Sequence, residues 1–198
     1  ETPVTGAGRT DTGVNAIAYV AHFDCEADLD LQNFRRKLNA ILPHSISILS
    51  IERADEGFHS RFDATNREYT YFLHRVKDPF VEEYSCLYTY PGLDFELMNK
   101  AAAMLAGRHD FRCFEKSGTD CKTSICTVTQ AYWTQYTPVI CASGVETGAE
   151  GCYWYFRISA DRFLRNMVRA VVGTLLEVGR GKRSLEDFAS LILPADED

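Results

Sequence analysis

Apolar and polar residues alternate in several stretches of this chain, a pattern typical of half-buried strands. In the clearest of them, residues 68–75, the side chains of Tyr69, Tyr71 and Leu73 fall on one face. The predicted strands are residues 17–23, 46–51, 68–75, 124–136 and 151–159.

Between the strands, apolar residues recur at helical spacing, and capping residues mark the helix ends. Asp30 and Asp94 are expected N-caps of two helices, which Pro43 and Gly107 close. Ser184 opens a final helix in the manner of a capping box. The predicted helices are 30–43, 94–107, 161–178 and 184–194, and the third is the longest. We expect an extended or looped segment at 58–64, a polar loop at 109–123 and a connecting turn at 139–150.

The order of these elements predicts an α+β fold. From residue 68 onward, strand, helix, strand, strand and helix follow each other, as in a split βαβ unit of the ferredoxin type that lacks its last strand. The preceding part fits the same unit without its opening. We therefore expect two halves, residues 1–64 and 65–198, with a mostly antiparallel sheet and flanking helices.

Composition narrows the class of protein further. The chain has 198 residues, 45% of them hydrophobic, which suffices for a large core. The longest apolar run, 167–178, contains Arg169 and Glu177 and is too short to cross a bilayer. Seven scattered cysteines without a Cys-x-x-Cys pair argue against a disulfide framework and against a metal site, and indicate a reducing, cytoplasmic location.

The glycine-rich stretch 6–16 is the first candidate for chemistry. Its glycines permit close approach of another molecule, and Arg9 and Asp11 lie two residues apart. A carboxylate beside a guanidinium suits a nucleophile or an ion-pair anchor better than a general acid. The simpler interpretation is a turn in which Asp11 caps the next element and Arg9 is solvated. The spacing fits neither a dinucleotide-binding fingerprint nor a Walker loop.

Arginines are the second candidate. The net charge of −7 speaks against a nucleic-acid partner at first sight, but a local groove can carry the opposite sign. In the predicted helix 161–178, Arg162, Arg165 and Arg169 form one stripe, and two of them lie in the first turns, where cations are disfavoured unless an anion binds. Arg61 and Phe62 could join a groove for single-stranded RNA.

Five segments, taken in order, resemble the tRNA pseudouridine synthase A (TruA) family. They are GAGRTDTGV at 6–14, FHSRF at 58–62, REYTY at 67–71, FLRNMVR at 163–169 and VGTLLEVG at 172–179. The resemblance extends over nearly the whole chain.

This resemblance implies the pseudouridine-synthase fold and a cofactor-free, metal-free isomerase that converts uridine to pseudouridine in the anticodon stem-loop of tRNA. Asp11 matches the family's catalytic aspartate, and Arg169 matches the arginine that pairs with it. Tyr69 matches the tyrosine that stacks on the target base, and Arg9 an arginine that helps to flip or position it. Arg61, Phe62, Arg162 and Arg165 complete the expected substrate-binding set. The resemblance also implies a homodimer with tRNA crossing both subunits.

The chain departs from the family in two ways. Asn15 stands where the family commonly has histidine, which we expect to be a mild change. The family's opening strand and helix would precede Glu1, and its closing segment would follow Asp198, so we expect a chain truncated at both ends.

Two other functions remain open at this point. One is a non-catalytic RNA-binding module with two RRM-like halves, in which Asp11 serves only as a loop cap. The other is a nucleotide-binding regulatory protein, which is weaker because Asp11 would repel phosphate.

Overall fold

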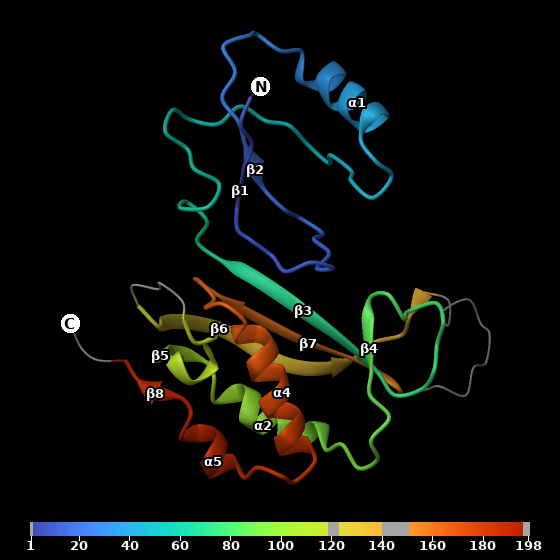
Figure 1. Ribbon diagram of the computed structural model, residues 1–198, viewed down its shortest axis with the longest axis vertical. Coiled ribbons are helices and arrows are strands. Elements are labelled where there is room, and N and C mark those ends of the chain that lie inside the picture. Colours follow the sequence, from blue (N-terminus) through green and yellow to red (C-terminus); the bar gives the residue numbers. More distant parts are fainter. Residues whose placement is uncertain (1, 119–122, 140–150, 196–198) are drawn as a thin grey trace. The chain divides into compact units, whose positions relative to one another are not determined.

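The computed structural model describes residues 2–118, 123–139 and 151–195. The chain divides into two compact units, Glu1–Thr65 and Asn66–Asp198, called here the N-terminal unit and the C-terminal unit (Figure 1). Each unit is described by itself.

The N-terminal unit contains a short antiparallel strand pair and one helix. Strand β1, Thr5–Gly6, pairs with β2, Ala21–His22. Helix α1, Leu31–Ile41, begins as predicted, because the Asp30 carboxylate accepts a hydrogen bond from the Asn33 N–H at 3.1 Å. It ends before Pro43, since the residue preceding a proline disfavours the helical conformation.

Two strands predicted for this unit are wrong or too long, because side chains take over the backbone hydrogen bonds. Of 17–23, Ala21 and His22 form a strand, while Tyr19 folds onto the backbone of Gly8. Residues 46–51 form no strand. There the Asn39 side chain binds both the N–H and the carbonyl of Ile48, at 2.7 and 3.0 Å, in place of a neighbouring strand. Residues 58–64 are looped, as expected.

The C-terminal unit is built on a six-stranded mixed sheet with the order β4-β3-β7-β6-β5-β8. Its strands are β3 (Arg67–His74), β4 (Ser85–Leu87), β5 (Gly107–Asp110), β6 (Ile125–Gln135), β7 (Tyr153–Ala160) and β8 (Leu193–Pro194). The β3–β4 pair is parallel and the other pairs are antiparallel. The sheet and its helices confirm the expected α+β class, with a mostly antiparallel sheet.

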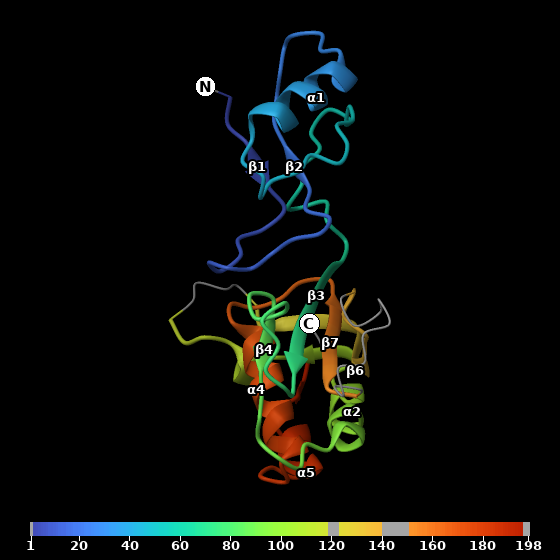
Figure 2. The same ribbon diagram turned by 90° about the vertical axis from the view of Figure 1, so that its right-hand side faces the viewer.

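Helices cover one face of this sheet (Figure 2). They are α2 (Phe95–Ala103), α4 (Met167–Gly179) and α5 (Leu185–Ala189), together with the 3-10 turn Arg112–Phe114. Phe156 and Ile158 of β7 are fully buried against Met98 of α2 and Val171 and Leu175 of α4 in one continuous core. Burial of this apolar surface is the main stabilising term of the unit.

The predicted polar loop 109–123 is wrong in its first half. Residues 107–110 form β5, and Phe111 and Phe114 are buried in the core. The polar residues next to Phe111 conceal this pattern, because Asp110 and Arg112 pair with each other at the surface of the core. Gly107 does not cap α2 either; it has a positive φ of 115° and begins β5.

The helix predicted at 161–178 begins six residues later, so the predicted arginine stripe is wrong. The Asp161 carboxylate accepts a hydrogen bond from the Thr127 N–H at 2.8 Å, which fixes residue 161 to β6. Asn166, with a left-handed φ of 66°, then turns the chain into α4. Arg162 and Arg165 consequently lie in the segment before the helix, and Arg169 lies in its first turn.

The end of the chain differs from the prediction as well. Ser184 caps α5 as expected, accepting from the Asp187 N–H at 3.0 Å, but the helix ends at Ala189. Pro194, expected at the helix end, belongs to β8 and pairs with His109. Most of the predicted turn 139–150 lies outside the described residues.

Candidate functional site

The glycine-rich loop joins β1 to β2, and a tyrosine fixes its shape. The Gly8 N–H donates to the Tyr19 hydroxyl at 3.1 Å, and that hydroxyl donates back to the Gly8 carbonyl. At Gly6 an added Cβ would lie 2.8 Å from Cε1 of the same ring, so a side chain there would break these bonds. A side chain at position 6 would therefore have to displace the Tyr19 ring.

Asp11 and Arg9 are both exposed on this loop. The Asp11 carbonyl accepts a hydrogen bond from the Val14 N–H at 3.2 Å, closing a turn whose third residue, Gly13, has a φ of 83°. The turn presents the Asp11 carboxylate at the surface of the unit, where a large substrate can reach it.

A hollow of about 350 Å³ lies beside the loop. Its lining residues are Val4, Thr5, Gly6, Gly8, Arg9, His59, Arg61 and Phe62. Three residues predicted for substrate binding, Arg9, Arg61 and Phe62, thus come together although about fifty residues separate them in sequence. Their shared position gives the hollow two cations and one aromatic ring.

A buried serine, Ser60, holds in place the loop that contributes His59, Arg61 and Phe62 to the hollow. The Ser60 hydroxyl, 3% exposed, donates to the Thr5 carbonyl of β1 at 3.0 Å. The Ser60 N–H donates to Nδ1 of His22 in β2 at 3.2 Å. These bonds attach the loop 58–63 to the strand pair that carries the glycine loop.

His59 fixes the backbone of the residues that follow it. Its Nδ1 accepts from the N–H groups of Arg61 and Phe62 at 3.2 and 3.3 Å, so the proton of the neutral ring is on Nε2. The main-chain N–H of His59 donates to the Asp63 carboxylate at 2.7 Å. Sequence reasoning did not assign roles to His59, Ser60 or Tyr19; for His59 and Ser60 the signal was their place inside the FHSRF segment.

The other predicted site residues belong to the C-terminal unit. Tyr69 of β3 is half-buried, and its ring meets Phe163 edge-on at a centroid distance of 5.1 Å. Arg165 and Arg169 are exposed, and Arg162 is half-buried. The N-terminal unit holds the other predicted site residues, Asp11, Arg9, Arg61 and Phe62. That residues of both units act in one site therefore stays a prediction.

Tyr71 shares the helix-covered face of β3 with Tyr69, and its hydroxyl is an additional polar group there. Burial, together with a hydrogen bond to Cys86, raises the pKa of Tyr71 to about 12. The positive charge of Arg169 acts in the opposite direction and lowers the pKa of Tyr71, but by less than burial raises it. Tyr71 remains neutral at physiological pH.

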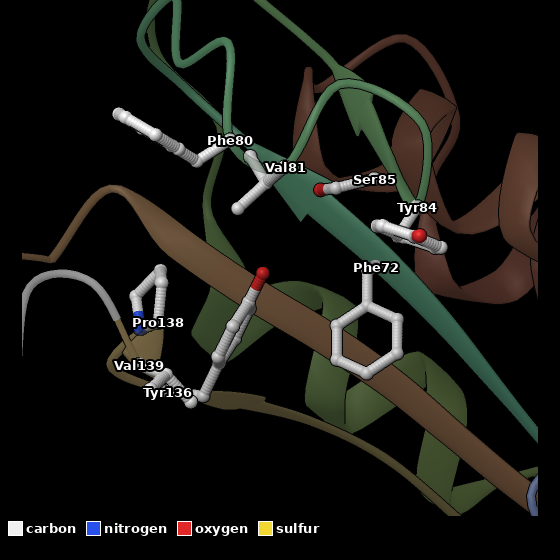
Figure 3. A pocket seen from close by; sticks show the side chains of 8 residues that line it. All are labelled: Phe72, Phe80, Val81, Tyr84, Ser85, Tyr136, Pro138 and Val139. Carbon is white, nitrogen blue, oxygen red and sulfur yellow. The ribbon is translucent and has the colours of Figure 1, made fainter.

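A cavity in the C-terminal unit is larger than this hollow but is not the candidate site. It measures about 590 Å³ and is lined mainly by apolar side chains such as Phe72, Val81 and Tyr136 (Figure 3). Ser85 adds a hydroxyl, which lies 2.8 Å from Nδ1 of the buried His74. None of the predicted site residues lines this cavity.

Two further findings concern the described residues as a set. They contain no group of three or more His, Cys, Asp or Glu side chains placed to hold a metal ion. No helix within these ranges is long and apolar enough to cross a membrane.

Comparison with known proteins identifies the family. A family model described as tRNA pseudouridine synthase matches residues 101–198. The tRNA pseudouridine synthase A of Bacteroides fragilis is 48% identical over 193 residues, which are 97% of this chain and 71% of that protein. The proteins of the same name from Parabacteroides distasonis and Bacillus subtilis are 46% and 36% identical, covering 98% and 99% of this chain and 71% and 74% of their own lengths. The chain therefore belongs to the tRNA pseudouridine synthase A family.

Proposed function

We propose that this chain isomerises uridine to pseudouridine in the anticodon stem-loop of tRNA, with Asp11 as the covalent catalyst. One observation carries the proposal: in a chain of this family, the Asp11 carboxylate is exposed on a preformed loop beside a hollow with two arginines and an aromatic ring. Carboxylate, cations and ring are the groups that a flipped base and its phosphates require.

The reaction needs no co-reactant, because the product is an isomer of the substrate. The bond between uracil N1 and ribose C1′ breaks, the ring turns, and C5 bonds to C1′. The hydrogen of C5 leaves as a proton, and N1 gains one. The Asp11 carboxylate attacks either the uracil ring or C1′, and both routes are nucleophilic carboxylate catalysis.

The remaining residues bind and orient the substrate in this proposal. Tyr69, braced by Phe163, stacks on the flipped uracil, and Arg169 pairs with the Asp11 carboxylate. Arg9, Arg61, Arg162 and Arg165 contact phosphates, a role that suits loop positions as well as helical ones. We also propose that two copies of the chain bind one tRNA together.

The test is release of tritium from unmodified tRNA labelled at C5 of uridine. Asp11→Asn keeps the shape of the side chain and removes the nucleophile, so release should fall by at least about 1,000-fold, or about 4 kcal/mol of barrier. Asp24→Asn, at another exposed aspartate of the same unit, is the matched control and should release tritium at the wild-type rate.

The same assay decides between the enzyme and the RNA-binding module. Because this chain spans 71% of the Bacteroides fragilis relative, the assay is also run on a protein extended to that full length, and tRNA binding without tritium release by that folded protein would contradict catalysis and favour the module. Equal release by wild type and Asp11→Asn would show that another residue is the catalyst.

A further inference from the structure

We propose that the 350 Å³ hollow of the N-terminal unit holds one unpaired nucleotide adjacent to the target uridine. The base stacks on the exposed ring of Phe62, and its phosphate lies between Arg9 and Arg61. This inference rests on the proposed function, because it places the nucleotide beside the loop that carries Asp11.

Phe62 has the properties of a stacking platform. Phe62 is 75% exposed, although phenylalanine is among the residue types most often fully buried. The His59 ring lies on it at a centroid distance of 4.2 Å and a tilt of 31°, and so supports it from one side. The exposed remainder of the ring lines the hollow, where a base can stack.

The platform is held rigid before any ligand binds. The N–H groups of Phe62 and Asp63 both donate to the His59 carbonyl at 3.0 Å, and Ser60 fixes the same turn to β1 and β2. A turn whose backbone is already fixed loses little conformational entropy on binding. The side chains of His59 and Ser60 are therefore positioning residues, and Phe62 and Arg61 make the contacts.

The charge around the ring fits a phosphodiester. Among the described residues that line the hollow are two arginines, Arg9 and Arg61, and no carboxylate. The Arg61 guanidinium carbon lies over the Phe62 ring, 5.8 Å from its centroid, so a base that stacks on this ring would come into contact with a cation. Guanidinium groups bind phosphate oxygens in a bidentate manner.

Size and stacking geometry select a single unpaired nucleotide. The volume lies at the low end of small-ligand sites, about 300–1,000 Å³, and gives no room for a duplex. A paired base has both faces covered by its neighbours, so the Phe62 ring can stack only on a base outside a helix. Asp11 follows Arg9 by two residues, which puts the reacting carboxylate at the adjoining nucleotide.

The test combines a protein variant with a scan of the RNA. Phe62→Leu keeps an apolar side chain and removes the aromatic face, and the Kd for unmodified tRNA should rise about 10-fold, within the range that base–aromatic stacking provides. Phe62→Trp should bind at least as well as wild type. Phe80→Leu, at a comparably exposed phenylalanine of the C-terminal unit, should leave the Kd unchanged.

Abasic substitution then identifies the nucleotide. Single loop nucleotides of the anticodon stem-loop are replaced by abasic residues, and each RNA is measured with wild type and Phe62→Leu. At one position next to the target the difference between the two proteins should disappear, because the base that Phe62 contacts is gone. Arg61→Gln should weaken binding to every one of these RNAs alike, since it contacts the backbone.

Two results would overturn the inference. One is an unchanged Kd for Phe62→Leu; the other is a raised Kd that no abasic position abolishes, which would indicate a purely structural role. The proposed function fails separately, if Asp11→Asn releases tritium normally. Because the binding scan needs no turnover, it decides about the hollow in that case as well.

Discussion

The two units of this chain maintain their structures by different means. In the C-terminal unit, large apolar side chains such as Phe156, Met98 and Leu175 are completely buried. Within residues 2–65 no hydrophobic side chain is buried, and the one buried residue is Ser60. The N-terminal unit instead relies on polar side chains that bind its own backbone, as Asn39 does at Ile48.

The comparison shows that apolar burial mainly provides stability, whereas hydrogen bonds mainly provide a precise geometry. Burying one large apolar side chain contributes about 1.5–3 kcal/mol, whereas a typical hydrogen bond contributes about 1 kcal/mol but fixes distance and direction. Within the described residues, the unit that presents Asp11 and the hollow therefore depends on directional hydrogen bonds for the shape of its loops. The unit that carries Tyr69 and Arg169 provides the stable framework for its side chains.

The largest effect is expected when one phenylalanine side chain in each unit is replaced by alanine. Phe156→Ala removes a ring that is fully buried and should lower the free energy of unfolding of the C-terminal unit by about 3–5 kcal/mol. Phe34→Ala, in helix α1, removes a half-buried ring and should cost about 1 kcal/mol.

Urea denaturation can follow the two variants separately. Both tryptophans of the chain, Trp133 and Trp154, are in the C-terminal unit, so their fluorescence reports on that unit, while far-ultraviolet circular dichroism reports on both. Equal losses of stability for the two variants would contradict the comparison.

A smaller effect is expected from the ion pair at the core of the C-terminal unit. The hydrogen bond from Arg112 lowers the pKa of Asp110 to about 2, below its value of about 3.8 in the unfolded chain. The pair thus stabilises the fold above pH 3.8, and this contribution is lost as the pH falls through 2. It should amount to about 1–2 kcal/mol, since Arg112 is partly solvated.

Asp110→Asn is the variant that measures this contribution. The variant should be less stable than wild type at pH 7, and the gap between the two urea midpoints should close as the pH is lowered from 4 to 2. A gap that stays constant over this interval would show that the carboxylate charge is not responsible. Asp187→Asn, at an exposed aspartate of the same unit, serves as the control.

The smallest effect is expected from the hydroxyl of Ser60. Ser60→Ala removes its bond to the Thr5 carbonyl and should cost about 1 kcal/mol, confined to the N-terminal unit. Hydrogen exchange should quicken in residues 4–8, 20–23 and 58–63, while the tryptophan fluorescence midpoint stays unchanged. Ser45→Ala, at an exposed serine, should have no effect on either measurement.

Sequence patterns predicted the long elements well. Strands β3, β6 and β7 lie within two residues of their predicted limits, because eight to eleven alternating positions give a clear signal. Strands β4, β5 and β8 have three, four and two residues, too few for any alternation to stand out. The start of α4 was missed because tertiary bonds, from Thr127 to Asp161, override a helical spacing of residues.

The candidate site was predictable in its residues and only partly in its arrangement. The position of Arg9, Arg61 and Phe62 around one hollow agrees with their common assignment to substrate binding. The supporting bonds of Tyr19 and Ser60 leave no pattern in the sequence, since they join residues eleven and fifty-five positions apart. The two-halves interpretation and the pairing of Asp11 with Arg169 stay predictions.

The strand order of the C-terminal sheet has a consequence for synthesis on the ribosome. β3 pairs along its whole length with β7, yet the chain must grow from His74 to Tyr153 before that partner exists. At about 5–20 residues per second, the roughly 80 intervening residues take on the order of 4–16 seconds to add. Local pairing with β4 covers only residues 72–74 on one edge of β3 early, and the other edge waits for β7. During those seconds the nascent chain carries an open, aromatic strand edge, the kind of surface that chaperones bind.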